Sequence, residues 1–253
     1  MPAVPSDGLL IGRDDELAAL MDRVSAVQGG QGGQAVLIEG EPGIGKSALA
    51  RAACAEAIGL GCQVFWGAGD ELGQTFPLLP FLDGLRVRES IPDKQREAIL
   101  ALLRGEIASG HGEDLPATLA EQLLVLVDEL CATRPTVLVI DDLQWADHAS
   151  VSLWERLARS ARHRPLLLIG MMRPVPQQED LLALRAHADL AAHVQLDALD
   201  DAAVAELVTA LAGGQPAEDL QGLAAGAAGN PLYLTELVDA LARSDGVDRK
   251  SVV

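Results

Sequence analysis

The chain has 253 residues, of which 49% are hydrophobic and 22% are charged, as in a folded globular protein. Its formal net charge of −18 opposes sequence-independent binding to nucleic-acid phosphates, so we expect any DNA contact to come from another part of a longer protein. The longest apolar run, PLLLIGMM at 165–172, is far shorter than the ~20 residues of a membrane span, and we expect no membrane partner.

Strands and helices are predicted to alternate along most of the chain. Apolar residues recur at spacings of three and four in the helical patterns, whereas short apolar runs such as TVLVI are typical of buried strands. The predicted elements are, in chain order, a helix at 11–24, a glycine-rich connector at 28–34, a strand at 35–40, a helix at 47–59, a strand at 63–69, an irregular stretch at 71–115 with a helix at 93–103, a helix at 117–131, a strand at 136–142, a helix at 149–161, a strand at 165–173, a helix at 179–188 and a last strand at 192–199. This alternation predicts an α/β fold whose parallel sheet has helices on both faces.

From about residue 200 the alternation stops. Three further stretches, at 200–213, 217–229 and 231–244, look helical and predict a small helical domain. The expected division of the chain is an N-terminal tail, helix and connector at 1–33, the α/β core at 34–198 and the helical domain at 199–253.

The chain carries no sign of secretion. Its N-terminus, MPAVPSDGLLIG, has neither a basic start nor a long apolar stretch, so we expect no signal peptide. Cys54, Cys62 and Cys131 are odd in number and fall in predicted helices and strands, which favours reduced thiols over a disulfide framework. We therefore expect a cytoplasmic protein.

The strongest motif is GEPGIGKS at 40–47, which follows a predicted strand. Two glycines separated by four residues, then lysine and serine, form the phosphate-binding pattern in which backbone N–H groups turn inward toward an anion. The N-terminus of the following helix adds partial positive charge, Lys46 can reach the β and γ phosphates, and Ser47 can ligate Mg²⁺. A plain glycine turn is the alternative, but the flanking strand and helix favour a P-loop NTPase: a parallel sheet flanked by helices, followed by the small helical domain.

The strand TVLVIDD ends in two acids. Asp141 is expected to hold the metal, directly or through water, and Asp142 to lie near the γ phosphate, where it could polarise an attacking water. A solvated acidic strand end is the alternative interpretation.

Other chemistry has little support in the sequence. The five histidines and three cysteines lack metal-ligand spacing, and no G-x-S-x-G elbow is present. Trp145 and Trp154 are better interpreted as packing anchors than as stacking platforms, and His148 has little support for a direct chemical role.

Five segments occur together in this order: IGRDDEL, EGEPGIGKS, VLVIDDLQWAD, LLLIGMMRP and AAGNPLYLTEL. In combination they resemble the AAA+-like ATPase module of STAND proteins, the signal-transduction ATPases with numerous domains. The likeness is greatest to the N-terminal part of large ATP-binding transcription regulators of the LuxR type, and it covers residues from about 10 to 241. It implies ATP or ADP with Mg²⁺ as ligands and a switch between the two nucleotide forms, and it is compatible with an oligomer in the ATP form.

The resemblance also implies roles for single positions. Gly12 and Arg13 would lie beside the adenine or ribose, and Pro231 would pack on the base from the helical domain. Arg173 would face the γ phosphate from a sensor strand that lies between the P-loop strand and the acidic strand; pairing with a nearby carboxylate is the alternative.

The remaining implied roles belong to the loop and the acids. Lys46 and Asp142 would be catalytic, and Ser47 and Asp141 would ligate the metal. The implied nucleotide-binding positions of the loop and the first helical turn are Gly40, Pro42, Gly43, Ile44, Gly45, Lys46, Ser47 and Ala48.

Two departures from the family qualify these expectations. Family members continue into further sensor and DNA-binding domains, whereas this chain ends at Val253, so we expect a fragment or a truncated relative. Asp142 stands where many P-loop motors have glutamate; its shorter reach should position water poorly, so we expect a weak ATPase.

Three alternatives stay open beside the regulatory switch. A P-loop small-molecule kinase would have room for an acceptor pocket only at 71–115, a ring-forming AAA+ motor would need an arginine finger that we do not find, and a scaffold would have an inactive site. Adenine is expected over guanine from the resemblance, and no N-K-x-D motif for guanine occurs in the sequence.

Overall fold

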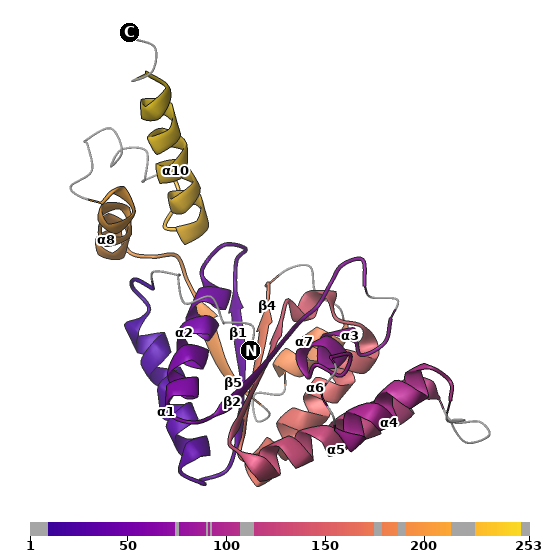
Figure 1. Ribbon diagram of the computed structural model, residues 1–253. Helices are drawn as coiled ribbons and strands as arrows, with labels where there is room; N and C mark the ends of the chain where they lie inside the picture. Colours follow the sequence, from indigo (N-terminus) through magenta and orange to yellow (C-terminus); the bar gives the residue numbers. More distant parts are fainter. Residues whose placement is uncertain are drawn as a thin grey trace.

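The computed structural model describes residues 10–73, 76–89, 91, 93–106, 114–174, 179–186, 191–213 and 226–248. A five-stranded parallel sheet lies at its centre (Figure 1). The strands are β1 (Gln34–Gly40), β2 (Gln63–Ala68), β3 (Thr136–Asp141), β4 (Leu166–Met172) and β5 (Ala192–Leu196). Their spatial order is β2-β3-β4-β1-β5, so β4 lies between the strand before GEPGIGKS and the strand that ends in the acids, as the resemblance implied.

The sequence of each strand fits its position in the sheet. Every residue of β3 and β4 is buried, because both are central strands with helices on both faces, and this explains their continuous apolar runs. The edge strand β5 instead alternates between more and less exposed residues, and only Leu196 at its end is buried. The predicted α/β architecture with a parallel sheet is therefore confirmed.

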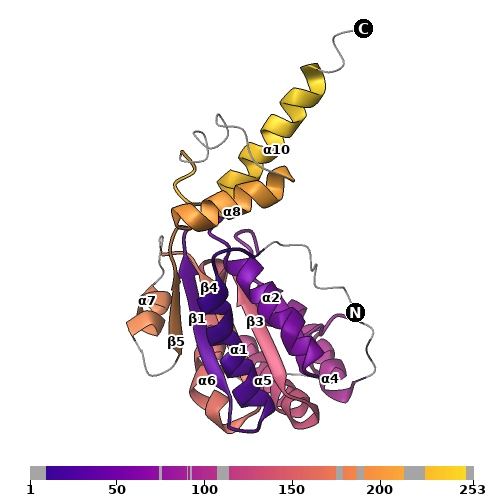
Figure 2. The ribbon, with the colours of Figure 1, turned by 90° about the vertical axis from the view of Figure 1, so that its left-hand side faces the viewer.

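Helices cover both faces of the sheet (Figures 1 and 2). On one face lie α1 (Asp14–Gln28) and α2 (Lys46–Gly59); on the other lie α3 (Leu79–Gly84), α4 (Lys94–Leu103), α5 (Leu115–Thr133), α6 (His148–Ser160) and α7 (Glu179–Ala186). α1 buries Leu20, Val24 and Val27 in the same cluster as α2, so the helix before the glycine connector is part of the sandwich.

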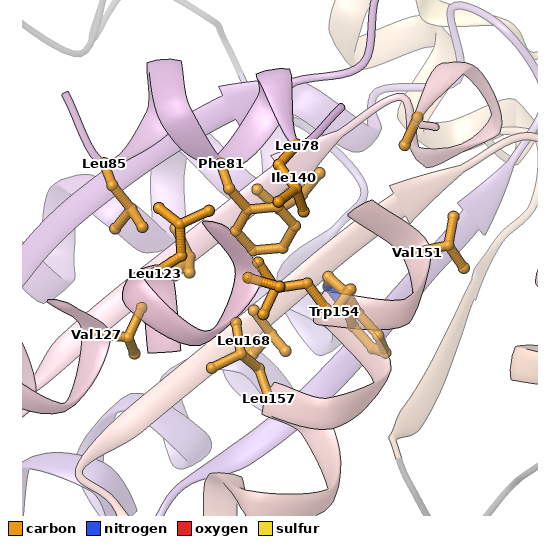
Figure 3. Close-up of a cluster of buried hydrophobic side chains, with 14 of the residues drawn as sticks. Leu78, Phe81, Leu85, Leu123, Val127, Ile140, Val151, Trp154, Leu157 and Leu168 are labelled. Atoms are coloured by element: carbon orange, nitrogen blue, oxygen red, sulfur yellow. The ribbon is translucent and has the colours of Figure 1, made fainter. Parts of the chain in front are cut away.

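The larger core layer lies under α3, α5 and α6. Figure 3 shows Phe81 of α3, Leu123 of α5 and Trp154 of α6 converging on side chains of β3 and β4. Trp154 and Phe81 are both 0% exposed, so the indole is a packing anchor, as predicted. Burying rings of this size on the sheet contributes several kcal/mol to the stability of this layer.

The helical part begins where the alternation ends. α8 (Asp201–Ala212) and α10 (Pro231–Asp248) pack on each other through a small cluster of their own, which includes Leu207 and Leu234. They lie beyond the carboxyl ends of the strands, above the loop that follows β1 (Figures 1 and 2). Most of the helix predicted at 217–229 falls outside the described residues, and the division of the chain at residue 198 stays a prediction.

Two local predictions were wrong. α1 begins at Asp14 and not at Ile11, because Gly12 has a positive φ of 66° and Arg13 has a non-helical backbone. The stretch at 71–115 was predicted to hold one helix, yet it also contains α3, which has only six residues and starts with a proline in its first turn. Six residues are too few to display a helical period.

The cysteines are buried and unpaired, as the sequence indicated. Burial raises the pKa of all three thiols, that of Cys54 to about 12, so they are inert at neutral pH. Within the described ranges, no helix combines the length and apolar character needed to cross a bilayer.

Candidate functional site

The parallel register brings three strand ends to one edge of the sheet. Glu39 pairs with Met172, so the loop after β1 and Arg173 after β4 begin at the same level. On the other side of β4, Ile140 pairs with Gly170, which brings the end of β3 to the same edge. The motifs GEPGIGKS, IDDLQWAD and MMRP, far apart in sequence, therefore meet there.

The loop between β1 and α2 has the geometry of an anion-binding loop. Gly43 and Gly45 have positive φ angles of 77° and 104°, a region that side chains rarely allow. α2 begins at Lys46 directly after the loop, and no side chain caps its first turn. The first N–H groups of the helix therefore lack intrahelical partners and point toward the loop, where they can bind phosphate oxygens.

All predicted loop positions lie in this element. They are Gly40, Pro42, Gly43, Ile44, Gly45, Lys46, Ser47 and Ala48, and they run from the last residue of β1 into the first turn of α2.

The ammonium group of Lys46 lies against its own loop. It donates hydrogen bonds to the carbonyl oxygens of Gly40 at 2.7 Å and Glu41 at 3.0 Å, and the side chain is almost fully buried. Burial lowers the pKa of Lys46, although the nearby carboxylates of Asp142 and Asp141 oppose this. A buried cation of this kind gains most from an additional anionic partner.

Ser47 and Asp141 form a hydrogen-bonded pair across the site. The Ser47 hydroxyl donates to Asp141 Oδ2 at 2.8 Å, and Asp141 Oδ1 accepts the backbone N–H of Asp142. Burial raises the pKa of the Asp141 carboxyl, the Ser47 hydrogen bond lowers it, and the adjacent charge of Asp142 raises it further. Two hydrogen bonds thus hold the carboxylate in a fixed orientation, and the nearby charge of Lys46 offsets only part of the effect of burial.

This pair fits a magnesium ion. Neighbouring ligands of an octahedral Mg²⁺ lie about 3 Å apart, close to the separation of these two oxygens. Among the described residues, no group of three or more His, Cys, Asp or Glu side chains could hold a metal. The other ligands would have to be phosphate and water oxygens, as is usual for Mg²⁺.

Asp142 leaves the strand that carries Asp141. Its backbone is left-handed, with φ 50° and ψ 49°, and a short 3₁₀ turn, Leu143–Trp145, follows. Its Oδ1 accepts a 2.5 Å hydrogen bond from the side-chain amide of Gln144 and lies 3.8 Å from Arg173 Nε. Since an αL conformation is uncommon for a non-glycine residue, this acid is positioned by a specific turn and not by the strand.

Arg173 lies at the end of β4, as predicted, and its guanidinium group is shared between two neighbours. Besides the contact to Asp142, its Cζ lies 5.9 Å from the centre of the Trp145 ring. This contact to a carboxylate is the alternative that the sequence left open; the predicted contact to a γ phosphate stays a prediction. Trp145 is half-buried and its ring faces this cation, so its predicted role as a packing anchor stays a prediction.

Gly12 and Arg13 lie against the P-loop and the helical part. Arg13 is 5% exposed and donates to the carbonyl oxygens of Ile44, at 3.2 Å, and Asp197, at 2.5 Å. A Cβ atom on Gly12 would come within 2.5 Å of Ala203 Cβ in α8. Both residues therefore lie where the core meets the helical part, and their predicted contact to adenine or ribose stays a prediction.

Pro231 begins α10, and its two neighbours contact the P-loop. The Asn230 side chain donates to the carbonyl oxygen of Pro42 at 2.9 Å, and the backbone N–H of Leu232 to that of Gly43 at 3.2 Å. A Cβ atom on Gly43 would lie 2.7 Å from Leu232 Cβ, so the loop glycine also permits this close approach. The predicted contact between Pro231 and a base stays a prediction.

Sequence reasoning gave no role to Gln144 or Asn230. Both were quoted within motifs, DDLQWAD and AAGNPLYLTEL. The only signal was the occurrence of an amide side chain beside residues that already had assigned roles. The contacts of Gln144 to Arg173 and of Asn230 to Pro42 join residues 29 and 188 positions apart.

Comparison with a family model identifies the core. The model described as "AAA ATPase domain" matches residues 9–169, well over half of the chain. Among curated proteins, the uncharacterized protein R02095 of Rhizobium meliloti (strain 1021) is 27% identical over 193 residues. That match covers 66% of this chain but 19% of the relative, so the chain corresponds to about a fifth of the relative's length.

Solved structures with the same fold include an Orc1, a RuvB and a DnaA protein. The Orc1 protein of Aeropyrum pernix, in complex with DNA, matches with a TM-score of 0.59 and 19% identity over 100% of this chain and 64% of its own. A RuvB mutant of Thermotoga maritima matches with a TM-score of 0.54 and 17% identity, over 95% of this chain and 66% of its own. The replication initiator DnaA, bound to AMPPCP and single-stranded DNA, matches with a TM-score of 0.59 and 14% identity, over 99% of this chain and 69% of its own.

At these identities the likeness shows the fold alone, and it confirms a P-loop NTPase fold with a parallel sheet flanked by helices. Together with the match of the family model over residues 9–169, it establishes that the chain belongs to the AAA ATPase domain family.

Proposed function

We propose that this chain is an ATP- and ADP-binding regulatory switch with slow ATP hydrolysis. The P-loop geometry, the Ser47–Asp141 pair and the membership of the AAA ATPase domain family support nucleotide binding with Mg²⁺. A switch also requires that the bound nucleotide alters another part of the molecule, because a ligand shifts an equilibrium only by its differential affinity for two states.

One observation carries the switch proposal. Three consecutive carbonyl groups of the P-loop accept hydrogen bonds from other parts of the chain: Pro42 from Asn230, Gly43 from Leu232 N–H and Ile44 from Arg13. Asn230 directly precedes α10 and Leu232 lies in its first turn, whereas Arg13 directly precedes α1. Any rearrangement of the loop on phosphate binding must therefore alter the contacts of the helical part.

Each residue of the site has a separate proposed role toward phosphate, metal or water. Lys46 would exchange the carbonyl oxygens of Gly40 and Glu41 for phosphate oxygens, which are charged and therefore stronger acceptors. Ser47 and Asp141 would hold Mg²⁺, which neutralises phosphate charge when bound. Asp142 would orient and polarise the attacking water, and Arg173 would exchange the Asp142 carboxylate for the γ phosphate.

The same geometry favours slow hydrolysis. Asp142 Oδ1 lies 3.8 Å from Arg173 Nε, so the carboxylate acts on water only after the guanidinium group has turned to the phosphate. The Asp142 side chain is also one methylene shorter than glutamate. A catalytic base must lie within hydrogen-bond reach of the proton that it removes.

We further propose that the switch is the N-terminal part of a larger signal-transduction ATPase that controls transcription. The five-motif resemblance to LuxR-type regulators supports this assignment, as does a curated relative of which the chain covers 19%. Expression of the longer gene product, and a test of nucleotide-dependent promoter binding, would examine the output. Promoter binding that does not respond to ATP or ADP would contradict it.

A ring-forming ATPase remains the second candidate, because the family and the fold are compatible with one. A motor should hydrolyse ATP faster at higher protein concentration as subunits assemble. A turnover number that is independent of concentration over the assembly range favours the switch.

The proposed function is tested by calorimetry and hydrogen exchange on one protein. We expect binding of Mg·ADP and of a non-hydrolysable Mg·ATP analogue, and exchange rates in α8 and α10 that differ between the two complexes. Binding of both nucleotides with identical exchange in α8 and α10 would contradict the switch and leave nucleotide binding intact.

A further inference from the structure

Gln144 is a buried amide that connects two strand ends. It is 2% exposed and lies in the 3₁₀ turn directly after Asp142. Its Nε2 donates to Asp142 Oδ1 at 2.5 Å, and its Oε1 accepts the backbone N–H of Arg173 at 3.1 Å. One side chain thus joins the residue after β3 to the residue after β4.

These two bonds determine the orientation of the amide. The carboxylate can only accept, and the backbone N–H can only donate, so the nitrogen must face Asp142 and the oxygen must face Arg173. Neither a carboxylic acid in its ionised form nor an apolar side chain can serve both partners. Buried polar groups are costly when unpaired, so the bridge holds both strand ends in a fixed relation.

The backbone around Asp142 makes this bridge necessary. The left-handed conformation of Asp142 is closed by a hydrogen bond from Trp145 N–H to the Asp142 carbonyl oxygen at 2.9 Å. That bond fixes the backbone but leaves the side chain free to rotate. Gln144 supplies the short contact that selects one orientation of the carboxylate, and Arg173 Nε contributes a longer one at 3.8 Å.

We propose that Gln144 is the positioning residue of the hydrolytic step, and that it couples Asp142 to the sensor residue Arg173. The proposal rests on the proposed function, in which Asp142 polarises water and Arg173 reads the γ phosphate. When the guanidinium group turns to the phosphate, Gln144 keeps Oδ1 of Asp142 in place, and Oδ2 is left to accept the proton of the water. Gln144 contacts neither the P-loop nor the metal ligands through any of these bonds.

Replacement of Gln144 should therefore change turnover and not nucleotide affinity. Gln144→Met keeps the length of the side chain and removes both hydrogen bonds. We expect single-turnover hydrolysis to slow at least about tenfold, as for a lost hydrogen bond to a charged group. The Kd of Mg·ADP and the KM of ATP should stay within about threefold of the parent values.

A matched control separates positioning from general damage. Thr136 is equally buried and hydrogen-bonded, but it lies at the opposite end of β3. Thr136→Val should lower the melting temperature by about as much as Gln144→Met does, but it should leave turnover unchanged. If Gln144→Met does not fold, Gln144→Asn is the second variant: it keeps the amide but is one methylene too short to reach both partners, and it should slow turnover in the same way.

The outcomes are distinct. Unchanged turnover in a folded Gln144 variant, or an equal loss in Thr136→Val, would overturn the role of Gln144 while the parent still binds and hydrolyses ATP. A parent protein that binds no nucleotide would overturn the proposed function itself. Slower turnover with retained Mg·ADP affinity, seen in the Gln144 variant alone, supports the proposal.

Discussion

Asp141 and Asp142 are neighbours in the chain, yet they lie in two different environments. Asp141 is the last residue of a buried strand, is 9% exposed and accepts from Ser47. Asp142 lies outside the strand in a left-handed turn, its side chain is 36% exposed, and it faces Gln144 and Arg173. The first acid is held by the sheet, whereas the second is held by a turn and by Gln144 and faces an arginine that we propose to exchange partners.

This difference suggests a division between binding and response. In a regular strand, consecutive side chains point to opposite faces, so two adjacent acids could not both serve one site. The turn at Asp142 removes that restriction, and both carboxylates act on Lys46. With the proposed roles, in which Asp141 holds the metal and Asp142 polarises water, the metal side of the site is rigid, whereas the water side depends on what Arg173 contacts.

Lys46 serves both acids, so its removal should have the largest effect. Lys46→Ala deletes a charge-assisted contact worth roughly 1.5–3 kcal/mol, and the affinity for Mg·ATP and Mg·ADP should fall at least about tenfold. Calorimetry measures both affinities. Lys94→Ala, which removes an exposed lysine from α4, is the control and should bind as the parent does. Equal affinities in parent and Lys46→Ala would refute the P-loop assignment.

Substitution of each acid in turn should separate the effect of the water side on hydrolysis from the effect of the metal side on nucleotide affinity. Asp142→Asn cannot accept a proton from water, so hydrolysis should fall at least about tenfold below a parent rate that is itself well under ~10 s⁻¹. The Kd of Mg·ADP should stay within about threefold. Asp141→Asn should instead weaken the Mg²⁺-dependent part of the affinity. Identical profiles for the two variants would show that the acids share one role.

Substitution of Arg173 tests the responsive side of the site alone, that is, the water side formed by Asp142 and Arg173. Arg173→Ala should lower the affinity for a non-hydrolysable ATP analogue about tenfold or more, because one guanidinium–phosphate contact is lost. The affinity for ADP should change by less than about threefold. Equal losses for both nucleotides would mean that Arg173 shapes the site in general and does not distinguish the γ phosphate.

Local pattern was sufficient to predict the rigid side of the site. The apolar runs of β1, β3 and β4, the glycine spacing and the following helix locate Lys46, Ser47 and Asp141 without tertiary information. Each of these residues is held by its own strand or helix terminus, so its position follows from the element that carries it.

The responsive side could not be predicted in the same way. VLVIDD does not indicate that its second acid adopts a left-handed backbone, and the sequence does not decide whether Arg173 meets a carboxylate or a phosphate. The bond between Asn230 and Pro42 joins residues 188 positions apart. Such contacts depend on how whole elements pack, which residue spacing does not encode.

The smallest predicted effect concerns stability, and it uses the burial of Asp141. Because burial raises the pKa of this carboxyl, the folded state binds its proton more tightly than the unfolded state does. At neutral pH the ionised group therefore opposes folding. Asp141→Asn keeps an oxygen that can accept the Asp142 N–H, its NH2 group can donate to the Ser47 hydroxyl oxygen, and the charge is removed. We expect the melting temperature, measured without nucleotide at pH 7, to rise by about 2–4 °C, the shift that ~1 kcal/mol produces in a chain of this size.

The pH dependence provides the check on this last prediction. Stability falls with rising pH wherever the folded state binds more protons, so the cost of Asp141 appears as pH rises from the ordinary aspartate pKa through the raised one. Below that window the carboxyl is protonated in both states, and the advantage of Asp141→Asn should vanish near pH 3. Asp142→Asn, in a more exposed position, should gain less at pH 7. An advantage of Asp141→Asn that is equal at both pH values would show that charge burial is not its cause.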